Sequence, residues 1–127
     1  MHADKSRLNE LSGNVIGCAF IVLNTLGAGF LEKVYENALA HELRKVGYAV
    51  VQQHGVTVMS DGAAVGEYLV DLLVEDALLV ELKAVKALDD AHRAQCVNYP
   101  KATDLPLCLL LNFGKPRLEI KRVVNRL

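Results

Sequence analysis

The sequence predicts one α/β domain spanning residues 1–127, in which a mixed β-sheet is flanked by helices. Three observations favour this class. Two N-terminal segments carry apolar side chains at three- and four-residue spacings, which is typical of helices packed on a core. A valine-rich region with turn residues follows, as expected of strands. Leu107–Phe113 is a nearly continuous apolar run, which is typical of a strand buried on both faces.

The composition is that of a globular protein. Hydrophobic residues make up 52% of the chain and charged residues 23%, which argues against disorder. The net charge of −1 gives no overall positive field, so any binding of nucleic acid must be local. The three cysteines, Cys18, Cys96 and Cys108, are widely spaced and form no CxxC pair. We expect reduced thiols in a cytoplasmic protein, without a disulfide framework or a zinc site.

Two helices are predicted before the first strand. The first covers Ser6–Leu26 and ends at Gly27 and Gly29, because glycine readily adopts the conformations that terminate a helix. The second covers Phe30–Val46 and ends at Gly47. Both should pack one apolar side on the sheet.

The stretch between Glu10 and Glu32 contains no charged residue and is long enough to suggest a membrane helix. However, Asn14, Asn24 and Thr25 lie inside it, and Gly27 and Gly29 interrupt it. Its strongest apolar residues form a single stripe: Leu8, Leu11, Val15, Val22 and Leu26. A helix of a soluble protein, with no membrane partner, is the better interpretation.

The remaining elements are mainly strands. We expect them at Tyr48–Met59, Val65–Val74 and Leu78–Val85, then a helix at Leu88–Thr103, a strand at Leu107–Phe113, and a strand or short helix at Leu118–Val124. Pro100 must kink or end the third helix. The predicted order is therefore ααβββαβ(β).

Two charged residues stand out in the third predicted strand. Glu81 and Lys83 alternate with Val80 and Leu82, so they point to the same face of the sheet. Their neighbours are aliphatic, which places the strand near the core. Burying charge is costly unless it is paired, so this pair requires a reason.

The hairpin before them offers one. A turn centred on Asp76 pairs Val74 with Leu78 and places Asp71 opposite Glu81, with Cβ atoms about 4.5–5.5 Å apart. Facing carboxylates repel each other unless a cation lies between them, and Mg²⁺ prefers such oxygen ligands together with water and substrate phosphate. A two-residue turn would shift this register by one. The alternative is a solvated face, on which Lys83 merely neutralises Glu81.

A longer set of motifs resembles a known family. Gly29–Tyr35 matches the signature of the GxxExxY protein family, which is assigned to the PD-(D/E)XK nuclease superfamily. The similarity continues through the strand of Asp71, then Glu81–Val85, Gln95–Tyr99 and Leu109–Phe113. It covers the chain from about Asn14 to Val124. The resemblance implies a restriction-endonuclease-like fold.

The resemblance also implies roles for individual residues. Asp71 and Glu81 match the metal-binding carboxylates, and Lys83 matches the catalytic lysine. Glu32 matches a helix carboxylate that this superfamily often adds to the metal site, and Gln95 matches a polar residue that faces the site.

The chain departs from the family pattern at three positions. Ala28 replaces a usual proline, a residue near Asn24 replaces a common histidine, and Pro100 replaces an apolar residue of the helix that carries Gln95. None of these is a metal carboxylate.

Some assignments stay open from the residues alone. Glu42 lies nearer the middle of the apolar face of its helix than Glu32, which the family signature favours. Gln95 and Tyr99 share a helix face, either towards the site or as a polar rim with a packed tyrosine. For Tyr35, we expect core packing with a satisfied hydroxyl. The C-terminal basic residues either follow a phosphate backbone or only solubilise the surface: Lys115, Arg117, Lys121, Arg122 and Arg126.

Taken with the resemblance, the sequence predicts hydrolysis of phosphodiester bonds of nucleic acid with Mg²⁺ or Mn²⁺, with DNA favoured as substrate. One rival is a non-catalytic module of the same fold that binds nucleic acid or a protein. Another is a structural protein with solubilising carboxylates. A homodimer also stays open.

Overall fold

The computed structural model describes residues 5–125 and has eight regular elements in the predicted order. In sequence these are α1 (Lys5–Leu26), α2 (Glu32–Lys45), β1 (Val50–Ser60), β2 (Ala63–Val74), β3 (Leu78–Lys83), α3 (Asp90–Thr103), β4 (Leu107–Asn112) and β5 (Glu119–Val124). Every predicted boundary lies within two residues of the observed one. The last element, left open between strand and helix, is a strand.

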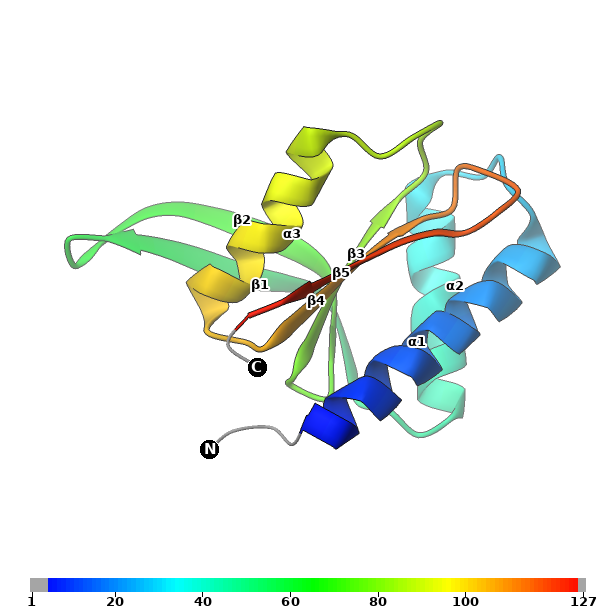
Figure 1. Ribbon diagram of the computed structural model, residues 1–127, viewed down its shortest axis with the longest axis horizontal. Coiled ribbons are helices and arrows are strands. Elements are labelled where there is room, and N and C mark those ends of the chain that lie inside the picture. Colours follow the sequence, from blue (N-terminus) through cyan, green and yellow to red (C-terminus); the bar gives the residue numbers. More distant parts are fainter. Residues whose placement is uncertain (1–4, 126–127) are drawn as a thin grey trace.

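The five strands form one mixed sheet in the order β1-β2-β3-β4-β5. Neighbouring strands are antiparallel except β3 and β4, which are parallel and joined through α3. Helices α1 and α2 cover one face, and α3 covers the other (Figure 1). The predicted α/β class with a sheet flanked by helices is confirmed.

The inner strands separate two apolar cores by strict alternation. Leu78, Val80 and Leu82 of β3 pack towards α1 and α2, whereas Leu79 packs towards α3. Glu81 follows Leu79 by two residues and is only 4% exposed. A carboxylate therefore lies within a strand that is otherwise aliphatic, on the α3 side of the sheet.

The loop between α1 and α2 is fixed by a buried tyrosine. The hydroxyl of Tyr35 donates to the carbonyl of Gly27 at 2.6 Å and accepts from the N–H of Phe30 at 3.1 Å. Its ring is fully buried and stacks on Phe113, with centroids 4.9 Å apart. The expected core role of Tyr35 is confirmed. Gly29 has a φ of 113°, which residues with a side chain rarely adopt. This tied loop sets where α2 begins, and thus where Glu32 lies.

Helix α3 is capped at its start and passes through a proline. The Asp89 carboxylate accepts from the N–H of His92 at 3.0 Å, and the His92 ring accepts from the N–H of Asp89. Pro100 does not end the helix, which continues for about one turn and stops at the left-handed Asp104. Gln95 and Tyr99 lie before Pro100 in the helix.

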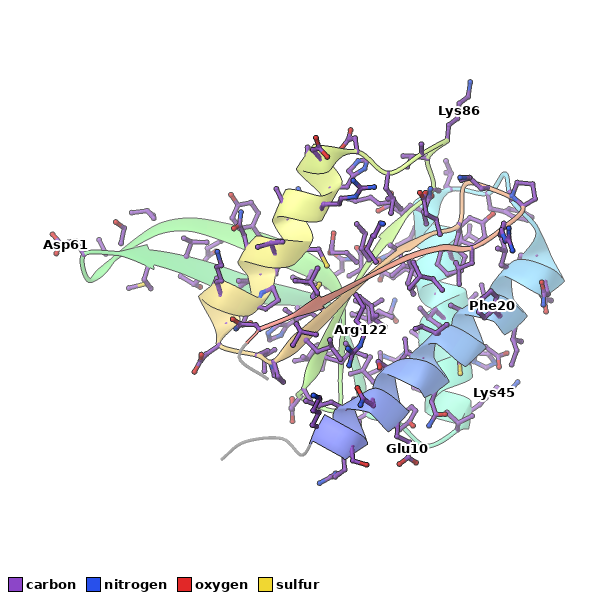
Figure 2. All side chains as sticks on the ribbon, viewed as in Figure 1. Glu10, Phe20, Lys45, Asp61, Lys86 and Arg122 are labelled. Carbon is purple, nitrogen blue, oxygen red and sulfur yellow. The ribbon has the colours of Figure 1, made fainter. Side chains whose placement is uncertain are left out.

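The outer half of the β1–β2 hairpin projects beyond the helices. Every side chain from Thr57 to Leu69 is at least partly exposed, and the hairpin turns at Asp61 and Gly62 (Figure 2). We call residues 57–69 the arm. No helix among the described residues is long and apolar enough to cross a membrane.

Candidate active site

Asp71 and Glu81 are joined where the β2–β3 ladder ends. Val74 pairs with Leu78 as predicted, and the ladder stops after Leu72 and Val80. Beyond the Leu72–Val80 pair, hydrogen bonds from backbone N–H groups to side-chain carboxylates join the two strands. The N–H of Asp71 donates to Glu81 Oε1 at 3.0 Å, and the N–H of Leu82 donates to Asp71 Oδ2 at 2.8 Å. The two carboxylates are thus held side by side on neighbouring strands.

Lys83 lies beside this pair. Its Nζ is 3.7 Å from Glu81 Oε2, and its side chain is only 18% exposed. The contact is an ion pair rather than a short hydrogen bond, so the ammonium group keeps donors for other partners. The structure therefore brings Asp71, Glu81 and Lys83 together at one end of β3.

Gln53 interrupts β1 opposite Asp71. Gln52 pairs with Leu72 and His54 with Val70, but the backbone pairing is broken at the position between them. Gln53 has a φ of 56°, which costs a non-glycine residue about 1–3 kcal/mol and is concentrated at functional sites. This conformation directs its amide nitrogen to Asp71 Oδ1, at 3.2 Å.

The same amide reaches a carboxylate that the sequence analysis did not single out. Gln53 Nε2 lies 2.6 Å from Glu36 Oε1, and Glu36 is 2% exposed. The other Glu36 oxygen accepts from Gln52 at 2.7 Å and from Lys33 at 3.0 Å. Two signals could have found this network: Glu36 follows Glu32 by one helical turn, and Gln52-Gln53-His54 interrupts a valine-rich strand.

Glu32 belongs to the same electrostatic group, whereas Glu42 does not. Glu32 begins α2 and is half-buried. Burial raises its pKa, Lys83 lowers it, and the Asp71 and Glu36 carboxylates raise it. Glu42 instead forms an ion pair with Lys45 at 3.2 Å.

Burial dominates the electrostatics of the strand carboxylates. Burial, with a smaller contribution from the Asp71 carboxylate, raises the pKa of Glu81 to about 7. The pKa of Asp71 is also raised by burial, while the hydrogen bonds from Leu82 and Gln53 oppose this change. Carboxylates whose pKa values are strongly perturbed by burial and by a neighbouring charge are concentrated at functional sites.

The chemistry of these donors fits a hard divalent cation, with one restriction. Within residues 5–125, no three acidic, histidine or cysteine side chains come together as a group able to hold a metal ion. The expected ligand set of Asp71, Glu81 and Glu32 is therefore not assembled as three ligands among the described residues. Two carboxylates remain sufficient for Mg²⁺, which keeps several waters and also binds substrate phosphate.

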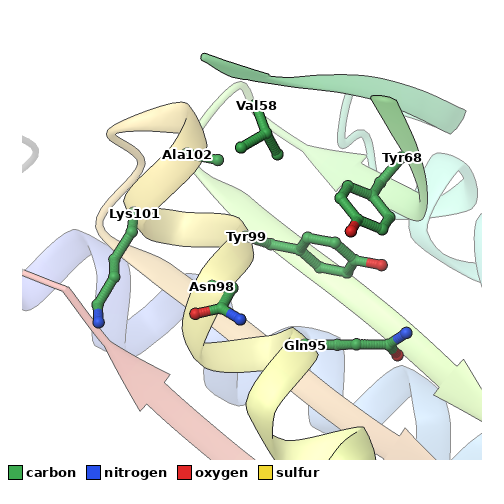
Figure 3. A pocket seen from close by; sticks show the side chains of 7 residues that line it. All are labelled: Val58, Tyr68, Gln95, Asn98, Tyr99, Lys101 and Ala102. Atoms are coloured by element: carbon green, nitrogen blue, oxygen red, sulfur yellow. The ribbon is translucent and has the colours of Figure 1, made fainter. Parts of the chain in front are cut away.

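Gln95 lies on α3, and within the described part of the chain the structure gives it no contact with the carboxylates. It is exposed and lines a 420 Å³ pocket between α3 and the arm, together with Asn98, Tyr99 and Tyr68 (Figure 3). Burial raises the pKa of Tyr99 to about 12, and the Glu81 and Asp71 carboxylates contribute to the increase. The pocket is therefore close enough to the carboxylates for Tyr99 to sense their charge.

Asn112 and Gly114 hold together the two segments that follow β3 and β4. The Asn112 side chain accepts from the N–H groups of Val85 and Gly114 and donates to the Val85 carbonyl and to Glu119. A Cβ atom at Gly114 would lie 2.3 Å from the Val85 backbone, so only glycine fits. Asn112, which pairs with Lys83 in register, thus has a structural role.

Two of the basic C-terminal residues lie on β5, and among the described residues the structure gives them no contact with the carboxylates. Lys121 and Arg122 are exposed on β5, and Arg122 bonds to Asn9 of α1 at 2.6 Å. Arg126 lies outside the described residues. All three cysteines are buried free thiols, as expected; Cys96 Sγ and Cys108 Sγ are 2.9 Å apart beneath α3.

Comparison with known proteins identifies the family and a similar fold. A family model described as the PD-(D/E)XK nuclease superfamily matches residues 9–123. Among solved structures, the fold is similar to an alkaline exonuclease from Laribacter hongkongensis, with a TM-score of 0.54 and 14% sequence identity. The similarity covers 98% of this chain and 72% of the exonuclease. None of the curated proteins compared with this chain matches it.

Proposed function

Because the chain belongs to the PD-(D/E)XK nuclease superfamily, we propose that it hydrolyses phosphodiester bonds of nucleic acid with Mg²⁺ or Mn²⁺, with Asp71, Glu81 and Lys83 as the central residues. The observation that carries this proposal is the juxtaposition of the buried Glu81 carboxylate and the partly buried Asp71 carboxylate with a lysine at the end of β3. Carboxylates with only a solubilising role would be solvated rather than enclosed on two inner strands of the sheet.

The residues divide the chemistry between them. Asp71 and Glu81 would hold the ion, and Glu32 would add a third negative charge of the same electrostatic group. A bound ion of this kind polarises a phosphate and lowers the pKa of a coordinated water. Lys83 donates only, so it would orient the attacking water and offset the negative charge that develops on phosphate. Gln95 would contact the substrate from α3.

The positioning of Asp71 depends on the network behind it. Gln53 holds one Asp71 oxygen and Leu82 the other, so the carboxylate is oriented before a cation arrives. Glu36 in turn fixes Gln53 in its strained conformation. We therefore assign Gln53 and Glu36 as positioning residues.

The test compares wild type, Lys83→Ala and Asp71→Asn on linear, nicked, branched and single-stranded DNA and RNA, in Mg²⁺ and in Mn²⁺. We expect Lys83→Ala to lose about 10²–10³ in rate, because one electrostatic contact to the reacting phosphate is removed. It should still bind Mn²⁺, as judged by a rise in melting temperature, whereas Asp71→Asn should lose that rise.

Two results would redirect the interpretation. If wild type binds nucleic acid but cuts none of these substrates, the chain is a binding module of the same fold. If Lys83→Ala cuts as fast as wild type, the lysine has no catalytic role and the site is elsewhere.

A further inference from the structure

The pocket between α3 and the arm is lined by two tyrosines that differ in their exposure to solvent. Tyr99 is 6% exposed and held in the α3 core, whereas Tyr68 lies on the arm and is 49% exposed. Their ring centroids are 5.8 Å apart with planes tilted by 58°, so the rings do not stack on each other. The Tyr68 ring therefore keeps a face available to a planar ligand.

The rest of the lining is polar in a way that suits a nucleobase. Gln95 and Asn98 each offer an amide donor and acceptor, which can pair with the edge of a base. Lys101 also lines the pocket, but its ammonium group extends away from the two rings (Figure 3). Figure 3 shows the Tyr68 ring above Tyr99, with Gln95 extending from α3 on the other side of the Tyr99 ring. An aromatic platform with amides at its border is how proteins bind single-stranded bases.

The pocket also lies beside the carboxylates. The Tyr99 ring extends from α3 over the face that carries Glu81, and its hydroxyl is influenced by both Glu81 and Asp71. Leu79 and Tyr99 belong to the same buried cluster, so a nucleotide whose base occupied the pocket would lie on the face of the sheet that carries Glu81. A base within a duplex is stacked on both faces and cannot enter.

From this geometry we infer that the Tyr68–Tyr99 pocket binds one unstacked base of a single-stranded nucleic acid, and so selects strand ends or unpaired segments as substrate. The inference rests on the nuclease function proposed above and deepens it by naming the substrate class. Tyr68 is the stacking platform, Tyr99 the fixed wall, and Gln95 and Asn98 the groups that meet the base edge.

Binding rather than cleavage tests the pocket. Fluorescence anisotropy with short labelled single strands of DNA and RNA, and with a blunt duplex, is measured in EDTA so that no strand is cut. We expect Tyr68→Leu to weaken single-strand binding about 5- to 100-fold, the usual range for loss of one base–aromatic stack. Tyr68→Phe should retain the affinity, because the ring is kept. An abasic substitution in the oligonucleotide should weaken wild type and leave Tyr68→Leu unaffected.

Leu69→Ala is the matched control. Leu69 is the next residue of the same strand, is 62% exposed and points to the opposite face, so its removal should leave the affinity unchanged. If binding of DNA, of RNA or of both depends on Tyr68, the result supports the pocket and shows which nucleic acid it binds. Equal binding by Tyr68→Leu and wild type, equal loss in Leu69→Ala, or stronger binding of the blunt duplex overturns it.

The two proposals fail separately. A wild-type protein that binds single strands through Tyr68 but cuts nothing keeps the pocket and loses the nuclease. A protein that cuts in Mn²⁺ but binds independently of Tyr68 keeps the nuclease and loses the pocket.

Discussion

Ionisation of Glu81 should make the stability of the metal-free protein depend on pH. Its pKa is raised from 4.5 to about 7, mainly by burial. The folded state therefore holds the proton more tightly than the unfolded state, and stability falls as pH rises from about 5 through 7. Converted at 1.36 kcal/mol per unit, the loss is about 3 kcal/mol.

We therefore expect Glu81→Gln to unfold with a much flatter pH dependence than wild type. The glutamine oxygen can still accept from the N–H of Asp71 but carries no charge. Urea unfolding in EDTA at several pH values between 5 and 8 measures this. Glu67→Gln, on the exposed arm, is the control and should follow wild type. Parallel wild-type and Glu81→Gln curves would show that the buried carboxyl is not the titrating group.

At the same scale, the sequence predicted only part of the site. Alternation along β3 and the length of the Glu75–Ala77 turn are enough to place Asp71, Glu81 and Lys83 on one face. Gln53 and Glu36 could not be found this way, because their meeting depends on a positive φ within a strand and on a helix from another part of the chain. Local patterns do not encode such a break in a ladder.

Among the elements, the turn from α1 into α2 should be sensitive to a small substitution. Gly29→Ala places a side chain at a φ of 113°, which we expect to destabilise the fold by about 1–3 kcal/mol. The loop would also lose its fit to the Tyr35 hydroxyl. Denaturant unfolding gives the difference directly.

Gly17→Ala is the control for this change. Gly17 is exposed within α1, and a Cβ atom there meets nothing within 4 Å. Alanine should therefore stabilise the helix by about 0.5–1 kcal/mol. If Gly29→Ala proved as stable as wild type, the loop would not constrain the start of α2.

The elements themselves were well predicted because each has a strong local signal. Apolar stripes mark the helices, glycine marks their ends, and Leu107–Phe113 reads as a buried strand. The order of strands and the parallel pairing of β3 with β4 had no such signal, because pairing between distant segments depends on the whole chain.

Across the whole molecule, packing is uneven. The inner halves of β2 and β3 are enclosed between the two helical layers, and their residues are almost completely buried. The arm, in contrast, is supported on one side by α3 and otherwise by its own cross-strand bonds. The carboxylates lie at the junction between these two regions.

Because packing is uneven, we expect the arm and the inner strands to open locally at two different rates. The arm can open without exposing either apolar core, so its amide hydrogens should exchange with solvent well before those of Leu72–Val74 and Leu78–Leu82. Hydrogen–deuterium exchange, followed by mass spectrometry of peptides from both regions, measures these rates. Equal exchange rates in the two regions would show that they open together as one cooperative unit. Tyr68 belongs to the arm, and Tyr99 is buried on α3. We therefore expect the Tyr68 side of the pocket to move on a shorter timescale than the Tyr99 side. A ligand that bridged both would slow exchange in the arm alone.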